Sequence, residues 1–267
     1  MQRTVRVVAT LVSLAATASI AEAQAAPGQD TTYLIRGGTV VNPGVAPMPN
    51  ADILIRNNRI VSVGPGASAA NAKVIDATGK FIYPGMIDAN TGIGLQEIGG
   101  IGTMSLRSEM GQFNPHMKAL VALNVESEIL GVTRANGVTA VLTSPTGGVI
   151  SGQATLINTA GWTWEDLAIV RTAGLMVNLP GGGGGGGRGG GGGGRGGGAP
   201  AVNPAQLQAD FDQFMTESRA YNAGRDAGTT KLDLIYEAMR PLFKREIPAI
   251  IPAGSEQQIR NAVAFGE

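Results

Sequence analysis

The chain has 267 residues, of which 43% are hydrophobic and 15% are charged. The hydrophobic share is enough to build a packed core, which excludes wholesale disorder. Twenty lysines and arginines balance twenty aspartates and glutamates, so no net charge attracts nucleic acid or an acidic surface. The absence of cysteine excludes disulfides, thiolate metal sites and a cysteine nucleophile. A single histidine argues against any site built from several imidazoles.

The first 25 residues have the pattern of a secretory signal peptide. Arg3 and Arg6 precede an apolar run over 7–20, and the small residues around Ala23 and Ala25 offer cleavage sites. The run is shorter than the ~20 residues that span a bilayer comfortably, and a retained membrane anchor is the alternative interpretation. We therefore expect cleavage near Ala23 or Ala25 and a periplasmic or secreted protein.

Residues 30–84 are predicted to form a small all-β unit. Runs rich in β-forming residues alternate with turn signals, among them Gly37-Gly38 and the tight turn at Asn57-Asn58. Runs of this length and spacing are typical of a small sandwich or meander. The expected strands are 33–36, 39–41, 51–56, 59–64, 73–76 and 80–83.

From Tyr83 onward the pattern changes to strands that alternate with helices, which predicts an α/β fold with a parallel sheet. Thr229 or Thr230 is a candidate cap for one helix, and Ser255 three residues before Gln258 fits a capping box. The expected strands are 84–88, 137–143, 167–177 and 247–251, and the expected helices are 119–130, 206–221, 230–243 and one that begins at 255.

Residues 181–198 are glycine except for Arg188 and Arg195. Such a tract cannot bury a core, and ordering it loses the most backbone entropy. Two arginines without interleaved aromatic residues provide little stacking or counterion release, so we expect no nucleic-acid partner. We interpret the tract as a flexible surface insertion.

An ordered series of short motifs runs through the chain. It consists of 37–42, 53–64, 74–80, 84–90, 134–139, 147–153 and 161–166. Their order and spacing resemble the amidohydrolase superfamily, and most nearly its secreted, imidazolonepropionase-like members. The resemblance covers essentially all of residues 33–267 apart from the glycine tract. It implies a small β-sandwich over 30–84, then an incomplete (β/α)₈ barrel over 85–267 with its site at the carboxyl ends of the barrel strands.

The resemblance also implies hydrolysis of carbon–nitrogen bonds other than peptide bonds. In the family, a His-x-His pair at the end of the first barrel strand would hold a divalent metal such as zinc, which activates a water molecule. The matching positions here are Asn90 and Gly92, and Pro252 stands where a later metal histidine would lie. None of these residues replaces an imidazole. We therefore assign no metal ligand, catalytic residue or substrate-binding residue in this chain.

Two other metal-site interpretations start outside those motifs. Asp88, Glu97 and Glu109 could offer oxygen ligands to a hard cation. Their spacing matches no metal motif, so we predict ordinary loop and cap residues. His116 lies in a loop-like stretch outside either motif, and we predict an exposed or packed loop histidine.

Three functional hypotheses stay open. The first is an exported amidohydrolase-type enzyme with a small-molecule substrate, and the second is an inactive relative that binds a ligand or serves as a scaffold. The third is a half-barrel completed by a second copy or a partner chain, because open strand edges favour association. The residues from Tyr83 to Glu267 are fewer than the ~250 of a complete barrel. We therefore expect a fragment of a longer reading frame.

Overall fold

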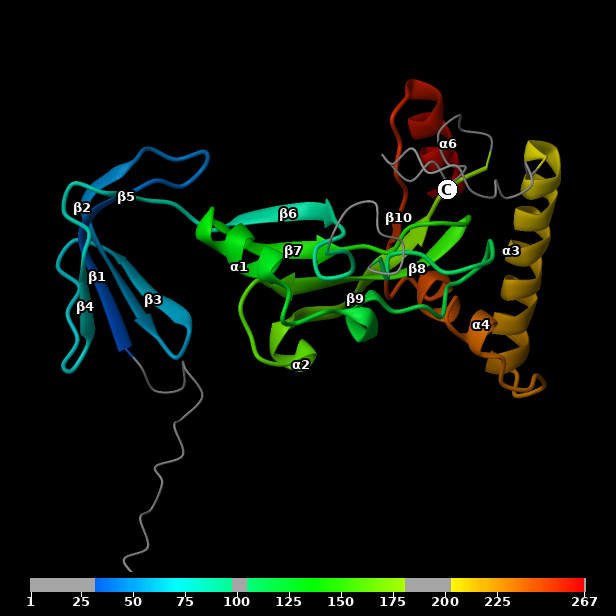
Figure 1. The fold of residues 1–267 in the computed structure, drawn as a ribbon, viewed down its shortest axis with the longest axis horizontal. Helices are drawn as coiled ribbons and strands as arrows, with labels where there is room; N and C mark the ends of the chain where they lie inside the picture. Colours follow the sequence, from blue (N-terminus) through cyan, green and yellow to red (C-terminus); the bar gives the residue numbers. More distant parts are fainter. Residues whose placement is uncertain (1–31, 98–104, 181–202, 267) are drawn as a thin grey trace, which may run out of the picture. The chain divides into compact units, whose positions relative to one another are not determined.

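The computed structural model describes residues 32–97, 105–180 and 203–266. The chain divides into two compact units, one up to Pro84 and one from Gly85 onward, and each is built on its own sheet (Figure 1). The predicted signal peptide and the glycine tract at 181–198 lie outside the described residues. Within the described ranges no helix is both long and apolar enough to cross a membrane.

The first sheet, in the first unit, has five strands in a mixed arrangement. β1 pairs antiparallel with β2 and parallel with both β4 and β5, and β2 pairs antiparallel with β3. Its core is small, with Val40, Ala51 and Ile53 buried. The strands are β1 (Thr32–Val40), β2 (Met48–Arg56), β3 (Arg59–Gly64), β4 (Lys73–Asp76) and β5 (Phe81–Ile82).

The Gly37-Gly38 pair does not make the predicted turn. β1 continues through it as one strand, and its register with β2 shifts at this point. Gly37 has φ 73°, a left-handed conformation that glycine adopts without strain, and its N–H donates to the Asp52 carboxylate at 3.0 Å. The pair therefore forms a β-bulge. The turn at Asn57-Asn58 is confirmed, because both residues have the positive φ of a type I′ hairpin turn.

The second sheet has the order β10-β9-β8-β7-β6. β6 is parallel to β7 and β9 is parallel to β10, whereas β8 is antiparallel to both neighbours. Four strands therefore run in one direction, and their carboxyl ends lie at one edge. We call this edge, formed by residues 91–92, 144, 178 and 251–252, the carboxyl edge. The strands are β6 (Met86–Thr91), β7 (Val138–Thr143), β8 (Ile150–Asn158), β9 (Ala168–Val177) and β10 (Ala249–Ile250).

The predicted parallel sheet is wrong at β8, which is antiparallel to both neighbours and was not among the predicted strands. β8 is buried along nearly all its length, including polar Gln153 and Thr155. Their side chains donate to backbone carbonyls, Gln153 Nε2 to Pro115 O at 3.1 Å and Thr155 Oγ1 to Val170 O at 3.0 Å. Apolar and polar residues alternate in β8 from Ile150 to Thr155, yet both sets are buried, so its polar residues do not mark a solvent-facing side of the sheet.

Two predicted helices are interrupted. The helix expected at 119–130 is a 3-10 turn followed by a separate helix. The helix expected at 230–243 is two short helices, and the Asp233 carboxylate, not a threonine, caps the first of them. The Ser255 cap is confirmed, because Ser255 Oγ accepts the N–H of Gln258 at 3.3 Å. The helices are η2 (Ala119–Ala122), α1 (Glu128–Ala135), α2 (Trp164–Leu167), α3 (Pro204–Asp226), α4 (Leu234–Glu237), α5 (Arg240–Phe243) and α6 (Glu256–Gly266).

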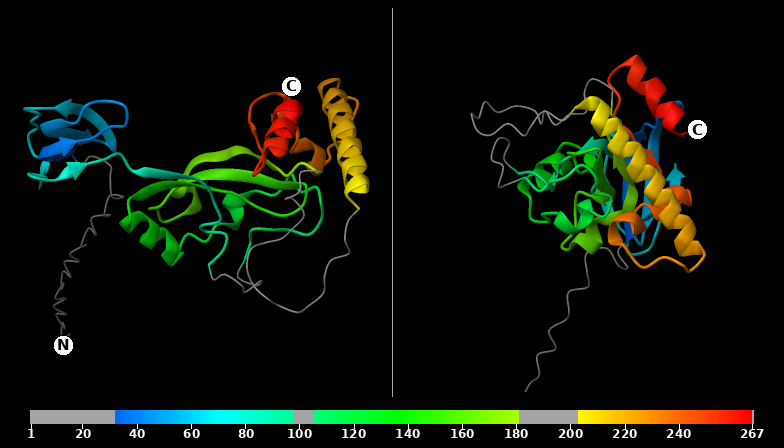
Figure 2. Two further views of the ribbon diagram at one scale, coloured as in Figure 1. Left: turned by 90° about the horizontal axis from the view of Figure 1, so that it is seen from above. Right: turned by 90° about the vertical axis from the view of Figure 1, so that its right-hand side faces the viewer.

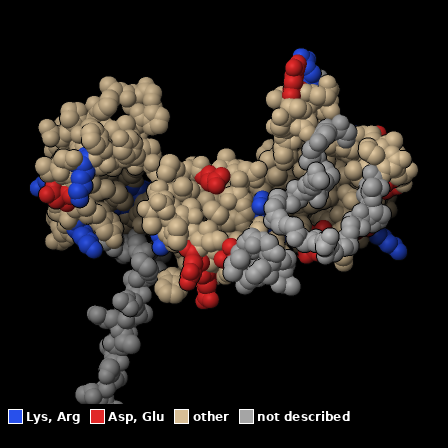
Figure 3. Space-filling model, turned by 45° about the horizontal axis from the view of Figure 1, so that its top comes forward, with Lys and Arg blue, Asp and Glu red and all other residues tan. Residues whose placement is uncertain are grey.

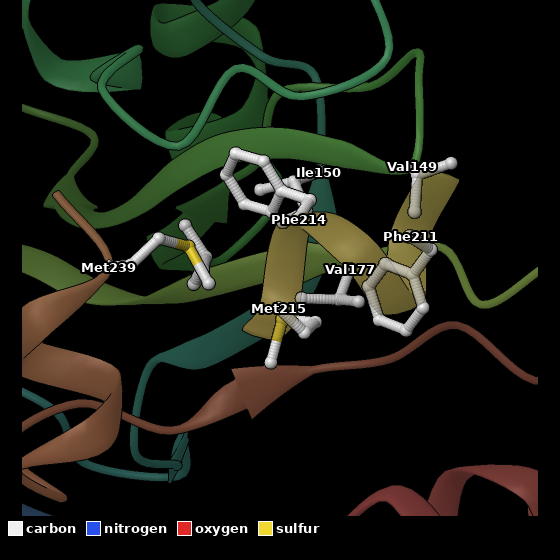
Figure 4. Packing of buried hydrophobic residues seen from close by; sticks show 8 residues of the cluster. Val149, Ile150, Val177, Phe211, Phe214, Met215 and Met239 are labelled. Carbon is white, nitrogen blue, oxygen red and sulfur yellow. The ribbon is translucent and has the colours of Figure 1, made fainter. Parts of the chain in front are cut away.

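Two apolar clusters hold the second unit together. In one, Phe211, Phe214 and Met215 of α3 pack against Ile150 at the start of β8 and Val177 at the end of β9 (Figure 4). In the other, η2, α1 and α2 pack on β7 and β8. The long helix α3 therefore lies across the end of the sheet at which β9 terminates (Figures 1 and 2).

Candidate functional site

The carboxyl edge brings together chain segments that are far apart in the sequence. The end of β6 pairs with the end of β7, Thr91 opposite Thr143, and Ser144 N–H donates to the Thr91 carbonyl at 2.9 Å. On the other side of the sheet, β10 pairs with the last part of β9. The positions that the sequence singled out, Asn90, Gly92 and Pro252, lie at the ends of β6 and β10.

Asn90 and Pro252 are exposed, and Gly92 opens a turn. The Asn90 N–H donates to the Asp88 carboxylate at 3.1 Å. The Gly92 carbonyl accepts the N–H groups of Leu95 and Gln96 at 3.0 and 3.1 Å, which turns the chain back after β6. These three positions provide one neutral amide and no imidazole, so they do not make a metal centre.

The side chain of Arg107 lies directly against Gly92. A Cβ on Gly92 would stand 2.4 Å from Arg107 Nε, 2.5 Å from Cδ and 2.6 Å from Cζ, all far inside van der Waals contact. The guanidinium therefore occupies the space into which any side chain at position 92 would extend. Gly92 is required here because of this close approach and not because of its own backbone angle.

The backbone of Arg107 is held between the loops that follow β6 and β7. Leu106 N–H donates to the Leu95 carbonyl at 2.7 Å, and Thr146 N–H donates to the Arg107 carbonyl at 2.6 Å. The guanidinium is partly buried, and its Nε has no hydrogen-bond partner among the described residues. Burial lowers the pKa of the Arg107 guanidinium, but an arginine in a protein stays protonated.

Ser144 supplies a second buried donor without a partner at this edge. Its side chain is fully buried, and Oγ makes no hydrogen bond within the described ranges. The neighbouring Thr143 hydroxyl, in contrast, donates to the Ile93 carbonyl at 2.9 Å. Asn178, which follows β9, donates to Ser151 Oγ at 3.0 Å. At the carboxyl edge, the Ser144 hydroxyl is therefore a buried donor without a partner among the described residues, and the positive charge of Arg107 lies beside Gly92.

The three carboxylates considered for a hard cation do not come together. Glu97 accepts hydrogen bonds from Asn124 Nδ2 at 3.0 Å and from Ser127 Oγ at 2.8 Å, which ties the loop after β6 to the start of α1. Across residues 32–97, 105–180 and 203–266, no three His, Cys, Asp or Glu side chains are arranged to hold a metal ion. Asp88, Glu97 and Glu109 thus form no cation site.

His116 is exposed and lies beside a cavity of about 700 Å³. This cavity also includes Glu246 and Ile247, which precede β10, so it lies away from the end of β10 that carries Pro252. Both positively and negatively charged side chains line the cavity. One of them, Arg240, already forms ion pairs with Glu237 and Asp226. On the face that Figure 3 shows, charged side chains are similarly scattered over a largely uncharged surface.

Sequence reasoning missed Arg107 and Ser144. Neither belongs to a motif, and Arg107 meets Gly92 only because the chain turns back after β6. The one available signal was the glycine itself, since a position without a side chain at a strand end permits close approach by another group.

Comparisons with known proteins give short sequence matches and one extensive structural match. No family model matches the chain. A dihydroorotase of Pelotomaculum thermopropionicum is 42% identical over 55 residues, 21% of this chain and 13% of that protein. A dihydropyrimidinase of Arabidopsis thaliana is 41% identical over 70 residues, 26% of this chain and 13% of that protein. The chain thus matches only about 13% of the length of these relatives.

The fold extends the similarity over most of the chain. The crystal structure of an amidohydrolase from Thermotoga maritima superposes with a TM-score of 0.71 over 88% of this chain and 61% of that one, at 23% identity. This match shows a shared fold. Together with the short sequence matches, it bears out the resemblance to the amidohydrolase superfamily that the ordered motifs carry.

Proposed function

We propose that the protein is an exported amidohydrolase-type enzyme that hydrolyses carbon–nitrogen bonds other than peptide bonds in a small molecule. The observation that carries the proposal is the fold that this chain shares with the Thermotoga amidohydrolase. In this chain, four parallel strands of the second sheet end at one edge. The relatives named dihydroorotase, dihydropyrimidinase and D-hydantoinase favour cyclic amides as the substrate class. In this proposal the first sheet is one layer of a small β-sandwich, and the second sheet is part of a (β/α)₈ barrel.

The residues at the end of β6 do not fit a catalytic metal. Asn90 is an exposed amide and Gly92 has no side chain. The positively charged guanidinium of Arg107 lies against Gly92, where it would repel a metal cation. We therefore assign no step of the reaction to a metal at this position.

Hydrolysis is tested with the natural exported protein, purified from the cells that make it. Dihydrouracil, dihydroorotate and hydantoin are offered with and without added zinc, and the ring-opened products are quantified by chromatography. The expected result is ring opening of at least one of them. A folded protein that opens none of these rings under either condition would contradict the enzyme proposal.

The contact between Arg107 and Gly92 favours a second function, a binding protein that recognises a small molecule at the carboxyl edge without hydrolysing it. The same assay separates the two functions. Saturable ligand binding without turnover supports the binding protein, whereas turnover refutes it.

We also propose export to the periplasm or beyond. The basic start and apolar run within residues 1–25 support this proposal. Amino-terminal sequencing of the natural protein should give a start directly after Ala23 or Ala25. A cytoplasmic protein that retains Met1 would contradict export.

A second copy or a partner chain is proposed to pair with the outer strands of the second sheet. β6 and β10 stand at the two ends of the strand order within the described residues. A strand with an unpaired side is a template for another chain. Light scattering of the purified protein should show a dimer or a complex, and a stable monomer would refute this pairing.

A further inference from the structure

We propose that Arg107, at the carboxyl edge beside Gly92, is the binding group for a small carboxylate. The inference rests on the proposed function only in placing the ligand at this edge, and it does not require hydrolysis. It is built from three features of Arg107: an uncompensated charge, a position opened by a glycine, and a neighbouring buried hydroxyl.

The charge of Arg107 has no counter-charge among the described residues. The ion pairs in these ranges all join residues between Arg225 and Arg260, and none includes Arg107. The carboxylate of Glu97 accepts hydrogen bonds from a neighbouring amide and hydroxyl, and the sequence from Ile98 to Met104 contains no acidic residue. A partly buried cation without a partner is unfavourable, so a bound anion would stabilise it.

Arg107 lies beside Gly92, and its positive charge is therefore at the carboxyl edge. Because Gly92 has no Cβ, the guanidinium packs against the backbone at the end of β6. On the same stretch of backbone, Ser144 N–H donates to the Thr91 carbonyl. The Ser144 hydroxyl, which has no hydrogen-bond partner among the described residues, therefore lies at the same edge. Arg107 Nε and Ser144 Oγ are both buried donors that lack an acceptor among the described residues, and an anion that enters this edge would provide acceptors.

The chemistry of these groups favours a carboxylate over a phosphate. The planar guanidinium offers parallel N–H donors that match the two oxygens of a carboxylate. One arginine balances one negative charge.

The test follows the Arg107 side chain in the full chain labelled with ¹⁵N-arginine. Its Nε–H resonance is assigned by comparison with Arg107→Gln and monitored while acetate, acetamide or inorganic phosphate is added. Acetate should shift the resonance saturably, acetamide should not, and phosphate should bind at least tenfold more weakly. An unchanged resonance in the folded protein at saturating acetate would overturn the proposal. Phosphate binding more tightly than acetate would overturn the carboxylate assignment.

Three variants make the test specific, with acetate affinity measured by the change in thermal midpoint and circular dichroism as the check of folding. Arg107→Gln should bind acetate at least tenfold more weakly. Arg260→Gln removes the same charge from an exposed helical pair with Glu256 and should stay within twofold of the parent. Gly92→Ala keeps the charge of Arg107 but displaces its guanidinium, and should weaken binding about fivefold or more.

Parent-like acetate binding by both Arg107→Gln and Gly92→Ala would overturn the proposal. If Arg107→Gln fails to fold, Gly92→Ala still tests the proposal, because the atoms that the new methyl group displaces belong to the flexible Arg107 side chain. The outcome is independent of catalysis. Absence of ring opening with intact acetate binding contradicts the enzyme proposal alone, whereas ring opening without acetate binding contradicts only the carboxylate site.

Discussion

The two sheets of this protein are stabilised in different ways. The first sheet has a small apolar core around Val40, Ala51 and Ile53, and β3 and β4 are exposed along almost all their length. The second sheet has β8 at its centre, buried along nearly all its length and covered by two apolar clusters. Local turn and strand signals therefore define the first sheet, whereas packing between distant segments defines the second.

The largest expected effect is loss of a core side chain from the second sheet. Leu175 in β9 is fully buried in the cluster that joins α3 to the sheet. Leu175→Ala should lower the free energy of unfolding by about 2–5 kcal/mol, through lost burial and the cavity left behind. Urea denaturation followed by circular dichroism measures the loss.

The matched control for Leu175 lies in the first sheet. Ile60 in β3 is 66% exposed, so Ile60→Ala should change the free energy of unfolding by no more than about 0.5 kcal/mol. If the two alanine variants lost equal stability, the contrast between the sheets would be wrong.

The first sheet should depend more on a buried polar group than on its core. Asp52 is buried, and its carboxylate accepts the N–H groups of Gly37 at 3.0 Å and Gly66 at 3.1 Å. Asp52→Ala leaves both donors unpaired and should cost about 1–3 kcal/mol in urea denaturation. Asp76 is the control, because its carboxylate is exposed and accepts hydrogen bonds from nearby Thr78, and its alanine variant should lose less stability.

A hydrogen-bond network between α3 and α4 should make the stability of the second unit depend on pH. Tyr221 Oη on α3 donates to Glu237 Oε2 at 2.8 Å and accepts the Asp233 N–H at 3.0 Å. The hydrogen bond from Tyr221 is the largest cause that lowers the pKa of Glu237. A lowered folded-state pKa means that the stabilisation is present above the unfolded value of about 4.3 and is lost as the pH falls through the folded value.

Tyr221→Phe should therefore lower the free energy of unfolding by about 1 kcal/mol at pH 7. The deficit should shrink at an acidic pH, as the pH falls through the lowered pKa of Glu237 in the folded state. Urea denaturation at the two pH values measures this. Tyr33→Phe in β1 is the control, because its hydroxyl makes no hydrogen bond among the described residues and the variant should match the parent at both pH values. A Tyr221→Phe deficit that grows on acidification would contradict the assigned role.

The first sheet could be predicted from the sequence more fully than the second. The hairpin at Asn57-Asn58 and the strand after it have local signatures, and the structure confirms them. β8 alternates apolar and polar residues from Ile150 to Thr155, but the structure buries both sets, whereas such a pattern indicates a half-buried strand. The helix expected at 119–130 has the right apolar spacing but is broken between η2 and α1 by backbone contacts with a distant turn, such as Asn124 N–H to the Gly94 carbonyl at 2.8 Å.

Only part of the candidate site could be predicted from the sequence. The ordered motifs located its strand ends, because residues such as Asn90 and Gly92 are adjacent in the sequence to a recognisable strand. Arg107 could not be located, because its position depends on where the chain returns after a turn. Ser144 has no local signature either, since a buried hydroxyl and an exposed one look identical in a sequence.

The smallest expected effect concerns the hairpin turn that defines the first sheet. Asn58 has φ 57° at the second central position of the β2–β3 turn, where glycine is the preferred residue of a type I′ turn. Asn58→Gly should raise the free energy of unfolding by a few tenths of a kcal/mol, and Asn58→Ala should lower it by about 1 kcal/mol, because alanine resists this conformation. Amide hydrogen exchange should slow in β2 and β3 of the glycine variant while β8 is unchanged. Equal changes in both sheets would mean that their stabilities are coupled and that the turn does not act on the first sheet alone.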